Sequence, residues 1–156
     1  MSTHTAELSW SQDEGDYFTL GRYTRVHEIA FDGGTTIQGS ASPTVVREPY
    51  SSAMAVDPEE MFVASLASCH MLWFLDLARR AGLEIFSYRD KPEGLLEKNA
   101  EGRIAITRVT LRPQIEMKGD ASKLADLHHK AHEACFIANS VRTEVSVEPQ
   151  DPMMKG

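Results

Sequence analysis

The chain has very few cysteines: Cys69 and Cys135 are the only two among its 156 residues. Two cysteines are too few for a disulfide scaffold, and the sequence contains no Cys-x-x-Cys pair of the kind that marks zinc sites and many redox motifs. Because the cytosol keeps resting thiols reduced, any disulfide in this chain is expected to form during a reaction cycle. No internal repeat or low-complexity segment is present.

The sequence also lacks an excess of positive charge. Its formal net charge is −7, and acidic and basic residues are interspersed along the chain. A nucleic-acid partner is therefore not expected, because phosphate binding requires a basic surface. Residues 1–7 have neither a basic segment nor an apolar run of the kind found in secretory signals, which favours a cytoplasmic location.

One long apolar run, Met61 to Ala78, approaches the length of a membrane-spanning helix. It contains His70 and Asp76, and arginines follow it directly. A helix that is apolar on nearly all sides is explained more simply as one enclosed by the rest of a protein. We therefore expect a buried central helix and no membrane partner.

The predicted boundaries of this helix are 57–81. Asp57 is a favoured N-cap with capping-box spacing to Glu60, and Pro58 suits the first helical position. Gly82 is expected to end the helix. A second helix is predicted over 121–138, with Asp120 as its N-cap and Asn139 as a possible C-cap.

Strands account for most of the remaining pattern. They are predicted over 5–11, 17–31, 35–41 and 143–147, and within 83–117, where the alternation changes phase and indicates a bulge near Thr107. Asp32-Gly33-Gly34 predicts a hairpin turn, 42–56 a loop and 149–156 a loose tail. This order predicts one α+β domain over 1–156, with its core in 5–148, rather than a doubly wound parallel sheet.

The two thiols can be reactive groups or small core residues. A reactive cysteine needs a cation or polar group nearby, because the thiolate is the nucleophile. His70 follows Cys69 but points about 100° away around the helix. The candidates for activating Cys69 are therefore in the strand near the N-terminus: Arg22, Arg25 and His27.

A metal site is a weaker alternative. The spacing of His128, His132 and Cys135 places them on one helical face, and His27 or Cys69 would complete a zinc site. His128 and His129 are nevertheless expected at a solvated or rim position. We expect neither a metal nor another cofactor.

Two motifs resemble the OsmC/Ohr family of organic hydroperoxide resistance and osmotically inducible proteins. The run Asp57-Pro-Glu-Glu-Met-Phe-Val-Ala-Ser-Leu-Ala-Ser-Cys69 is similar to the family's cysteine-bearing helix. The Ala-x-x-x-Cys135-x-x-x-Asn-Ser pattern is similar to the family's second cysteine. The turn after Phe31, the Ser42-Pro43 pair and the order of elements also match, so the resemblance covers about residues 5–148.

The resemblance implies an intertwined homodimer, in which antiparallel sheets enclose the long helix and each active site lies at the subunit interface. It also implies a thiol peroxidase that reduces organic hydroperoxides to alcohols. In that mechanism Cys69 attacks the peroxide, Cys135 resolves the sulfenic acid as a disulfide, and an external dithiol, lipoyl-type or other, restores both thiols. Glu59 would be the family's glutamate and Arg25 its arginine, with Arg22 as the alternative.

The chain departs from the family pattern beside both cysteines. Phe136 stands where a proline is common, and His70 follows Cys69. Met71, Trp73, Phe74 and Phe136 are available to line a pocket for bulky apolar peroxides. Since Glu59 and Cys69 are ten residues apart, they lie about 15 Å apart along a straight helix, so a long arginine or a partner subunit must connect them. The alternative on the same fold is a binding or stress protein with structural or slowly reacting thiols.

Overall fold

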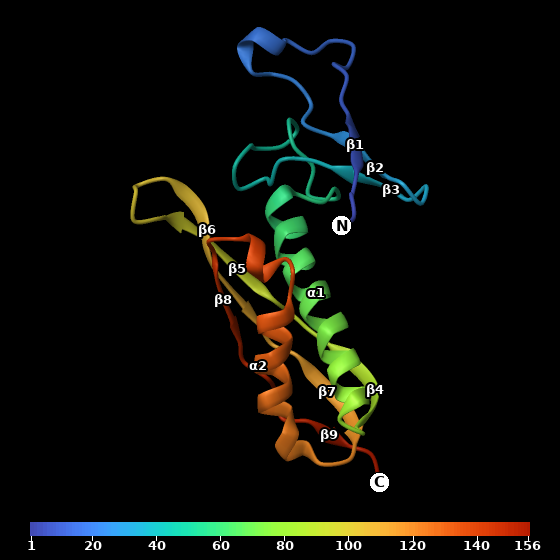
Figure 1. The fold of residues 1–156 in the computed structure, drawn as a ribbon. Coiled ribbons are helices and arrows are strands. Elements are labelled where there is room, and N and C mark those ends of the chain that lie inside the picture. The colour runs from blue at the N-terminus through green and yellow to red at the C-terminus, as the bar shows by residue number, and fades with distance from the viewer. The chain divides into compact units, whose positions relative to one another are not determined.

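A computed structural model describes residues 1–156 as two compact units, Met1–Met61 and Phe62–Gly156. Helices and three-stranded sheets are both present, as expected for an α+β chain (Figure 1). We call the two parts unit 1 and unit 2 and describe each by itself.

Unit 1 contains an antiparallel sheet of three strands. Its strands are β1 (Ala6–Ser9), β2 (His27–Phe31) and β3 (Thr36–Gly39). The predicted hairpin is confirmed: β2 and β3 pair across the Asp32-Gly33-Gly34 turn, and Gly34 takes a positive φ of 87° that favours glycine. The following segment, 42–56, contains no strand or helix, as predicted.

The prediction of a continuous strand over 17–31 is wrong in its first half. A short 3₁₀ helix, η1 (Phe18–Leu20), occupies that part, and Gly21 ends it in the left-handed conformation with φ 72°. Tyr17 and Arg22 then form an isolated bridge across the turn. The aromatic residues that suggested a strand pack on one another instead, with Phe18 and Tyr23 ring centroids 4.6 Å apart.

The long helix has the predicted boundaries to within one residue. It is α1, Pro58–Arg80. The capping box is formed in both directions: the Glu60 amide donates to Asp57 Oδ1 at 2.7 Å, and the Asp57 amide donates to Glu60 Oε2 at 3.0 Å. At the other end the amides of Gly82 and Leu83 donate to the last turn, and Gly82 has a φ of 78°.

Four strands follow α1 in two antiparallel pairs. Strand β4 (Glu84–Arg89) pairs with β7 (Gln114–Lys118), and β5 (Glu93–Lys98) pairs with β6 (Ile104–Leu111). In the second pair, Leu95 lies opposite Arg108 but Leu96 lies opposite Ile106. Thr107 is the extra residue, so the bulge predicted there is confirmed.

The second helix is shorter than predicted. Asp120 does cap its start, accepting from the Ser122 amide, but a 3₁₀ turn, η2 (Ala121–Lys123), precedes α2 (Leu124–Ala134). Cys135 leaves the helix with an extended ψ of 111°, and a further 3₁₀ turn is η3 (Ala138–Ser140). Asn139 is therefore not the residue that ends the helix, although its side-chain amide donates to the carbonyl of Glu133 at 2.9 Å.

The C-terminal strands pair in parallel. The predicted strand near 143–147 is β8 (Glu144–Val147), which lies parallel to β6. The tail is not loose as predicted, because β9 (Met153–Met154) pairs in parallel with β7 and the Lys155 amide donates to the Met117 carbonyl. Unit 2 therefore has two mixed sheets, in the orders β4-β7-β9 and β5-β6-β8.

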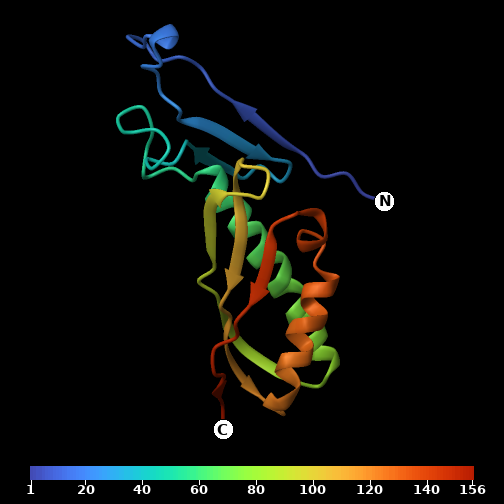
Figure 2. The same ribbon diagram turned by 90° about the vertical axis from the view of Figure 1, so that its left-hand side faces the viewer.

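Two hydrophobic clusters hold unit 2 together. The first joins Phe74 and Ala78 of α1 to Met117 of β7 and Leu127 of α2. The second joins Leu66 of α1 to Val109 and Leu111 of β6. In both ribbon views α2 runs beside α1, and the strands cover the helices from one side (Figures 1 and 2). The part of α1 that belongs to unit 2, residues 62–80, thus packs against α2 and the strands.

Helix α1 is also long and apolar enough, by length and composition alone, to cross a membrane. Core helices of soluble proteins pass the same test. The buried positions of α1 are Leu66, His70, Phe74 and Ala78, which recur every four residues and form one stripe. Such a stripe is expected of a helix that packs against protein on one face.

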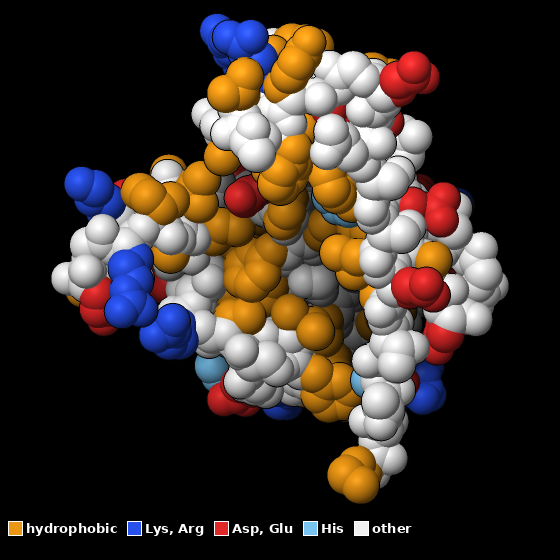
Figure 3. Space-filling model, turned by 90° about the horizontal axis from the view of Figure 1, so that it is seen from above, with side chains coloured by type: hydrophobic (Ala, Val, Ile, Leu, Met, Phe, Trp, Pro, Cys, Tyr) orange, Lys and Arg blue, Asp and Glu red, His pale blue; other side chains and the backbone are white.

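Unit 1, in contrast, has little core of its own. Among the buried hydrophobic residues of the chain, Ile29 alone belongs to it. Several of its large apolar side chains are exposed, including Leu8, Trp10, Phe18 and Leu20. Figure 3 shows many hydrophobic side chains open to solvent. An apolar surface of this kind indicates an interaction site.

Candidate functional site

The two cysteines meet in unit 2. Cys69 lies in the middle of α1 and is half-buried, whereas Cys135 directly follows α2 and is 1% exposed. Both are free thiols, and Cys69 lies near enough to Cys135 to raise its pKa. The backbone amide of Ala138 also donates to Cys135 Sγ at 3.4 Å. Residues 66 positions apart in the sequence thus form a dithiol pair.

The environment of Cys135 favours its protonated form. Burial is the main cause, and the neighbouring thiol of Cys69 adds to it; together they raise the pKa of Cys135 to about 11. A neutral Cys135 has an S–H group that can donate toward the sulfur of Cys69. The two thiols are therefore unequal: one is more accessible, and the other is a buried donor beside it.

An aromatic pair lies next to the dithiol in the chain. Trp73 follows Cys69 by one helical turn, and Phe136 is the neighbour of Cys135. Their rings meet edge to face, with centroids 5.4 Å apart at 87°. Phe136 is 69% exposed, so this pair can contact a ligand from solvent.

The other two residues expected to line a pocket, Met71 and Phe74, differ in their burial. Met71 is half-buried on α1. Phe74, however, is 0% exposed and packs in the core, where its ring stacks on His128 with centroids 4.3 Å apart. Because Phe74 has no surface exposed to solvent, it contributes to core packing and does not line a substrate pocket.

The candidate arginine lies in unit 1, in an aromatic cavity of about 280 Å³. Arg25 Nη1 donates to the carbonyls of Gly21 at 2.9 Å and Tyr23 at 2.6 Å, and the guanidinium stacks on the Tyr23 ring at 3.6 Å. Trp10, Phe18 and His27 also line this cavity. Arg22 is instead exposed on the turn after η1. Of the two arginines, Arg25 is thus the one held in a defined position.

The two glutamates at the start of α1 have separate roles. Glu60 is occupied by the capping box. Glu59 has a buried carboxylate oxygen, Oε2, with no hydrogen-bond partner. A buried, unpaired carboxylate oxygen is costly, so this position suits a cationic partner.

A pair of histidines is buried beside the core. His70 Nε2 lies 3.0 Å from His128 Nδ1, and burial lowers the pKa of both residues to about 4. The expectation that His128 is solvated is therefore wrong; the ring is 2% exposed because it packs under Phe74. His129, in contrast, is exposed as expected.

No group of three or more His, Cys, Asp or Glu side chains is placed to hold a metal ion. The alternative of a zinc site at His128, His132 and Cys135 therefore finds no support in this geometry. Cys135 is engaged with Cys69 and the Ala138 amide instead.

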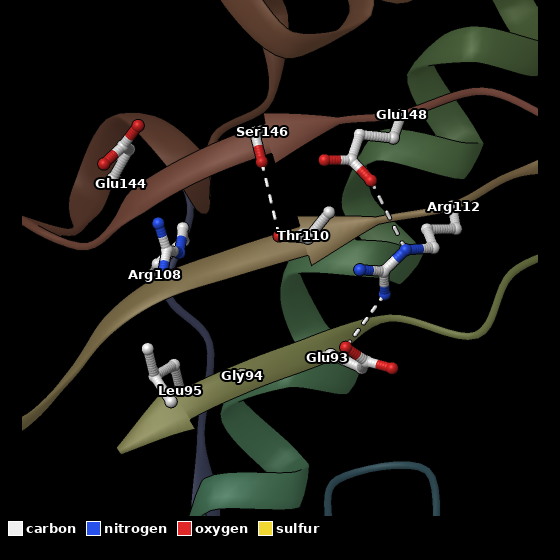
Figure 4. A pocket seen from close by; sticks show the side chains of 9 residues that line it. All are labelled: Glu93, Gly94, Leu95, Arg108, Thr110, Arg112, Glu144, Ser146 and Glu148. Atoms are coloured by element: carbon white, nitrogen blue, oxygen red, sulfur yellow. Dashed lines mark hydrogen bonds and ion pairs between the residues drawn. The ribbon is translucent and has the colours of Figure 1, made fainter. Parts of the chain in front are cut away.

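A third feature is a polar groove of about 560 Å³ on the sheet β5-β6-β8. Figure 4 shows Arg112 between two carboxylates, Glu93 at 3.1 Å and Glu148 at 3.4 Å. The groove contains no cysteine or histidine, and its arginines lie among glutamates. It offers neither a thiol nor a histidine that could activate a hydroxyl, so it is a poorer candidate for chemistry than the dithiol.

The sequence reasoning missed two parts of this arrangement. The His70–His128 pair was not anticipated, although His70 falls on the same four-residue spacing as Leu66, Phe74 and Ala78, which was a usable signal. The aromatic cavity around Arg25 was missed as well. It depends on contacts of Trp10 with Phe18 in η1 and with Tyr23 after it, which local periodicity does not report.

Comparisons with known proteins find relatives of this chain in sequence and in fold. A structure of an OsmC-like protein of unknown function from Vibrio cholerae is 47% identical, with a TM-score of 0.93, and the match covers 96% of this chain and all of that one. An uncharacterized protein, YmaD, from Bacillus subtilis is 25% identical over 124 residues, which are 75% of this chain and 82% of that protein.

A structure with much lower sequence identity has a similar fold. An organic hydroperoxide resistance protein from Elizabethkingia anophelis is 14% identical with a TM-score of 0.67, and the match covers all of this chain and 98% of that one. The sequence pattern of OsmC-like proteins matches residues 51–150, which include both cysteines. The chain therefore belongs to the OsmC-like protein family.

Proposed function

We propose that this protein is a thiol peroxidase that reduces organic hydroperoxides to alcohols. The observation that carries the proposal is the placement of two free thiols, Cys69 and Cys135, close together inside unit 2. Two free thiols that are already close together need little movement to form a disulfide. Family members that share the fold are named organic hydroperoxide resistance proteins.

The reaction has two steps on the protein. The thiolate of Cys69 attacks the outer oxygen of the hydroperoxide; an S–O bond forms, the O–O bond breaks, and the alkoxide takes a proton and leaves as the alcohol. The Cys135 sulfur then attacks the Cys69 sulfenic acid. An S–S bond forms, the S–O bond breaks, and the oxygen leaves as water. An external dithiol reduces the disulfide by exchange.

Cys69 is proposed as the attacking thiol because it is the more accessible of the two. Cys135 is buried and stays protonated, so its S–H donates to the Cys69 sulfur until oxidation makes that sulfur electrophilic. A buried resolving thiol is also protected from direct oxidation. The order of attack then follows from the difference in burial.

Arg25 and Glu59 are proposed to assist. A guanidinium has a fixed charge and a planar set of donors, which suits it to stabilise a thiolate and to bind peroxide oxygens. The unpaired Oε2 of Glu59 can accept from that guanidinium and orient it. Assembly of the site then requires Arg25 to exchange its backbone partners, Gly21 and Tyr23, for these groups.

The proposed substrate class is bulky and apolar. The edge-to-face pair of Trp73 and Phe136, with Met71 nearby on α1, offers an apolar surface next to the thiols in sequence. Aromatic side chains supply large contact areas for hydrocarbon groups. The alkyl or aryl part of the hydroperoxide would contact this surface.

A homodimer is proposed as the working form of this single OsmC-like domain. Unit 1 buries Ile29 but leaves several large apolar side chains exposed. A three-stranded sheet with so little core needs a further surface to pack against. A second copy of the chain would provide it. We place this dimer in the cytoplasm, with a lipoyl-type or other dithiol as reductant and without a cofactor.

The test is peroxide consumption by the purified protein with cumene hydroperoxide and dihydrolipoamide. We expect turnover by the wild type, none by Cys69→Ser, and no dithiol-supported turnover by Cys135→Ser. In the last variant a sulfenic acid at Cys69 should accumulate and be trapped by dimedone. Undiminished turnover by Cys69→Ser would refute the proposal.

The burial of Cys135 also favours a second candidate, a binding or stress protein whose thiols react slowly. A raised pKa leaves little Cys135 thiolate at neutral pH. In that case the wild type would consume hydroperoxide no faster than Cys69→Ser. The same assay therefore separates the two candidates.

A further inference from the structure

A cavity of about 280 Å³ lies between α2 and strand β8 of unit 2, and neither cysteine lines it. Helix α2 and strand β8 run side by side in both ribbon views (Figures 1 and 2). The residues that line the cavity are Ala125, His128, His129, His132, Val145, Val147 and Pro149. Its volume is just below the usual range for small-molecule sites, about 300–1,000 Å³, so it suits a small ligand.

Two ring nitrogens of these lining residues are buried without a hydrogen-bond partner. They are Nε2 of His128 and Nδ1 of His132. His128 is 2% exposed, so its free nitrogen is well removed from bulk solvent. Buried polar groups in native proteins are nearly always satisfied, so unsatisfied nitrogens beside a cavity indicate a ligand that meets them.

The hydrogen bond with His70 determines whether His128 Nε2 is a donor or an acceptor toward this ligand. The 3.0 Å hydrogen bond between His70 Nε2 and His128 Nδ1 uses one nitrogen of each ring. In two neutral imidazoles, one ring donates and the other accepts, so His128 Nε2 is a donor in one tautomeric arrangement and an acceptor in the other. A hydroxyl group can both donate and accept, so it fits either arrangement.

Other classes of ligand fit less well. An anion is disfavoured because no lysine or arginine lines the cavity and burial lowers the pKa of His128 to about 4, which leaves that ring neutral. A metal ion is disfavoured because no third ligand is in place. A wholly apolar molecule would leave both nitrogens unpaired.

We propose that this cavity binds a small neutral alcohol or phenol, with the hydroxyl hydrogen-bonded to His128 Nε2 and His132 Nδ1 and the apolar body against Val145, Val147 and Pro149. The site is independent of the dithiol and of the proposed peroxidase reaction. A protein that fails as a peroxidase can still bind at this position.

The experiment titrates the full-length protein with phenol and follows the histidine side-chain resonances by ¹H–¹⁵N NMR. We expect saturable shifts of His128 and His132 with a Kd of about 1 mM, which is ordinary for a ligand of this size. Toluene, which has the same shape but no hydroxyl, should bind at least about tenfold more weakly, because it leaves the two nitrogens unpaired.

Two variants of α2 localise the binding. Ala125→Leu adds bulk to an exposed lining position and should weaken phenol binding at least about tenfold by filling the cavity. Lys130→Leu changes an exposed residue of the same helix that does not line the cavity, and it should bind phenol as the wild type does. Any of three results would overturn the proposal: no saturable shifts, equal affinity for toluene, or unchanged affinity in Ala125→Leu.

Discussion

His70 on α1 and His128 on α2 share a buried hydrogen bond, with 3.0 Å between their ring nitrogens. Phe74 stacks on the His128 ring and closes the pair from one side. The bond joins α1, which contains Cys69, to α2, which Cys135 directly follows. Packing in unit 2, which contains both cysteines, therefore depends on the charge of these two imidazoles.

Because the His70–His128 pair is buried and neutral, the folded protein is expected to lose stability in mild acid. Burial lowers the folded-state pKa of each ring from 6.5 to about 4, so the unfolded chain takes up protons first as the pH falls below 6.5. The contribution of the two neutral histidines to the free energy of unfolding is fully present above pH 6.5. It is lost as the pH falls toward 4. Each ring contributes up to about 3 kcal/mol to this loss. Thermal unfolding at pH 7, 6 and 5 measures it.

The control for this prediction removes the titrating groups. In His70→Leu/His128→Phe the fall in unfolding temperature between pH 7 and 5 should be smaller than in the wild type, whatever the absolute stability of the variant. A wild-type unfolding temperature that stays constant over this interval would show that the imidazoles are not protected from protonation.

The unequal burial of the two thiols predicts an order of alkylation. Cys69 is half-buried, whereas Cys135 is 1% exposed with its pKa raised to about 11. Iodoacetamide at pH 7.5 should therefore modify Cys69 at least about tenfold faster than Cys135. Peptide mass spectrometry on a time course gives both rates. Preferential labelling of Cys135 would reverse the proposed roles.

Replacing Arg25 by lysine is predicted to lower the peroxidase activity. Arg25→Lys keeps the charge but removes the planar set of donors, and kcat/KM for cumene hydroperoxide should fall by about a hundredfold. Arg22→Lys, a matched change three residues away on an exposed turn, should have little effect. Equal losses in the two variants would remove Arg25 from the proposed site. Near-UV circular dichroism checks that the surrounding aromatic cavity is intact.

The exposed ring of Phe136 predicts a change in substrate preference. Phe136→Ala removes one half of the aromatic pair with Trp73 without disturbing a buried position. The KM for cumene hydroperoxide should rise roughly tenfold, since apolar contact area is lost, whereas activity toward hydrogen peroxide should stay nearly constant. A parallel change for both peroxides would place the substrate elsewhere.

Local signals in the sequence predicted those parts of the fold that neighbouring residues determine. Asp57 and Gly82 define the ends of α1 because capping acts within one turn. The change of phase near Thr107 located the bulge. The end of α2 was predicted too late, because the apolar spacing continues to Ala138 while Cys135 turns out of the helix.

Contacts between distant segments were not predictable in the same way. The parallel pairing of β9 with β7 depends on a partner about forty residues away, so Met153 and Met154 gave no local sign of a strand. The meeting of Cys69 and Cys135 was expected from resemblance to a family and not from spacing. His128 was placed at the surface because its burial depends on Phe74 and His70, which lie on another helix.

The proposed chemistry is tested most directly by treating the reduced protein with one equivalent of cumene hydroperoxide and mapping the product by mass spectrometry of the intact and digested chain. A single intramolecular Cys69–Cys135 disulfide should form, with the loss of two hydrogen atoms and the release of one equivalent of alcohol, and dihydrolipoamide should reverse it. Two thiols that remain free while the hydroperoxide persists would contradict the account.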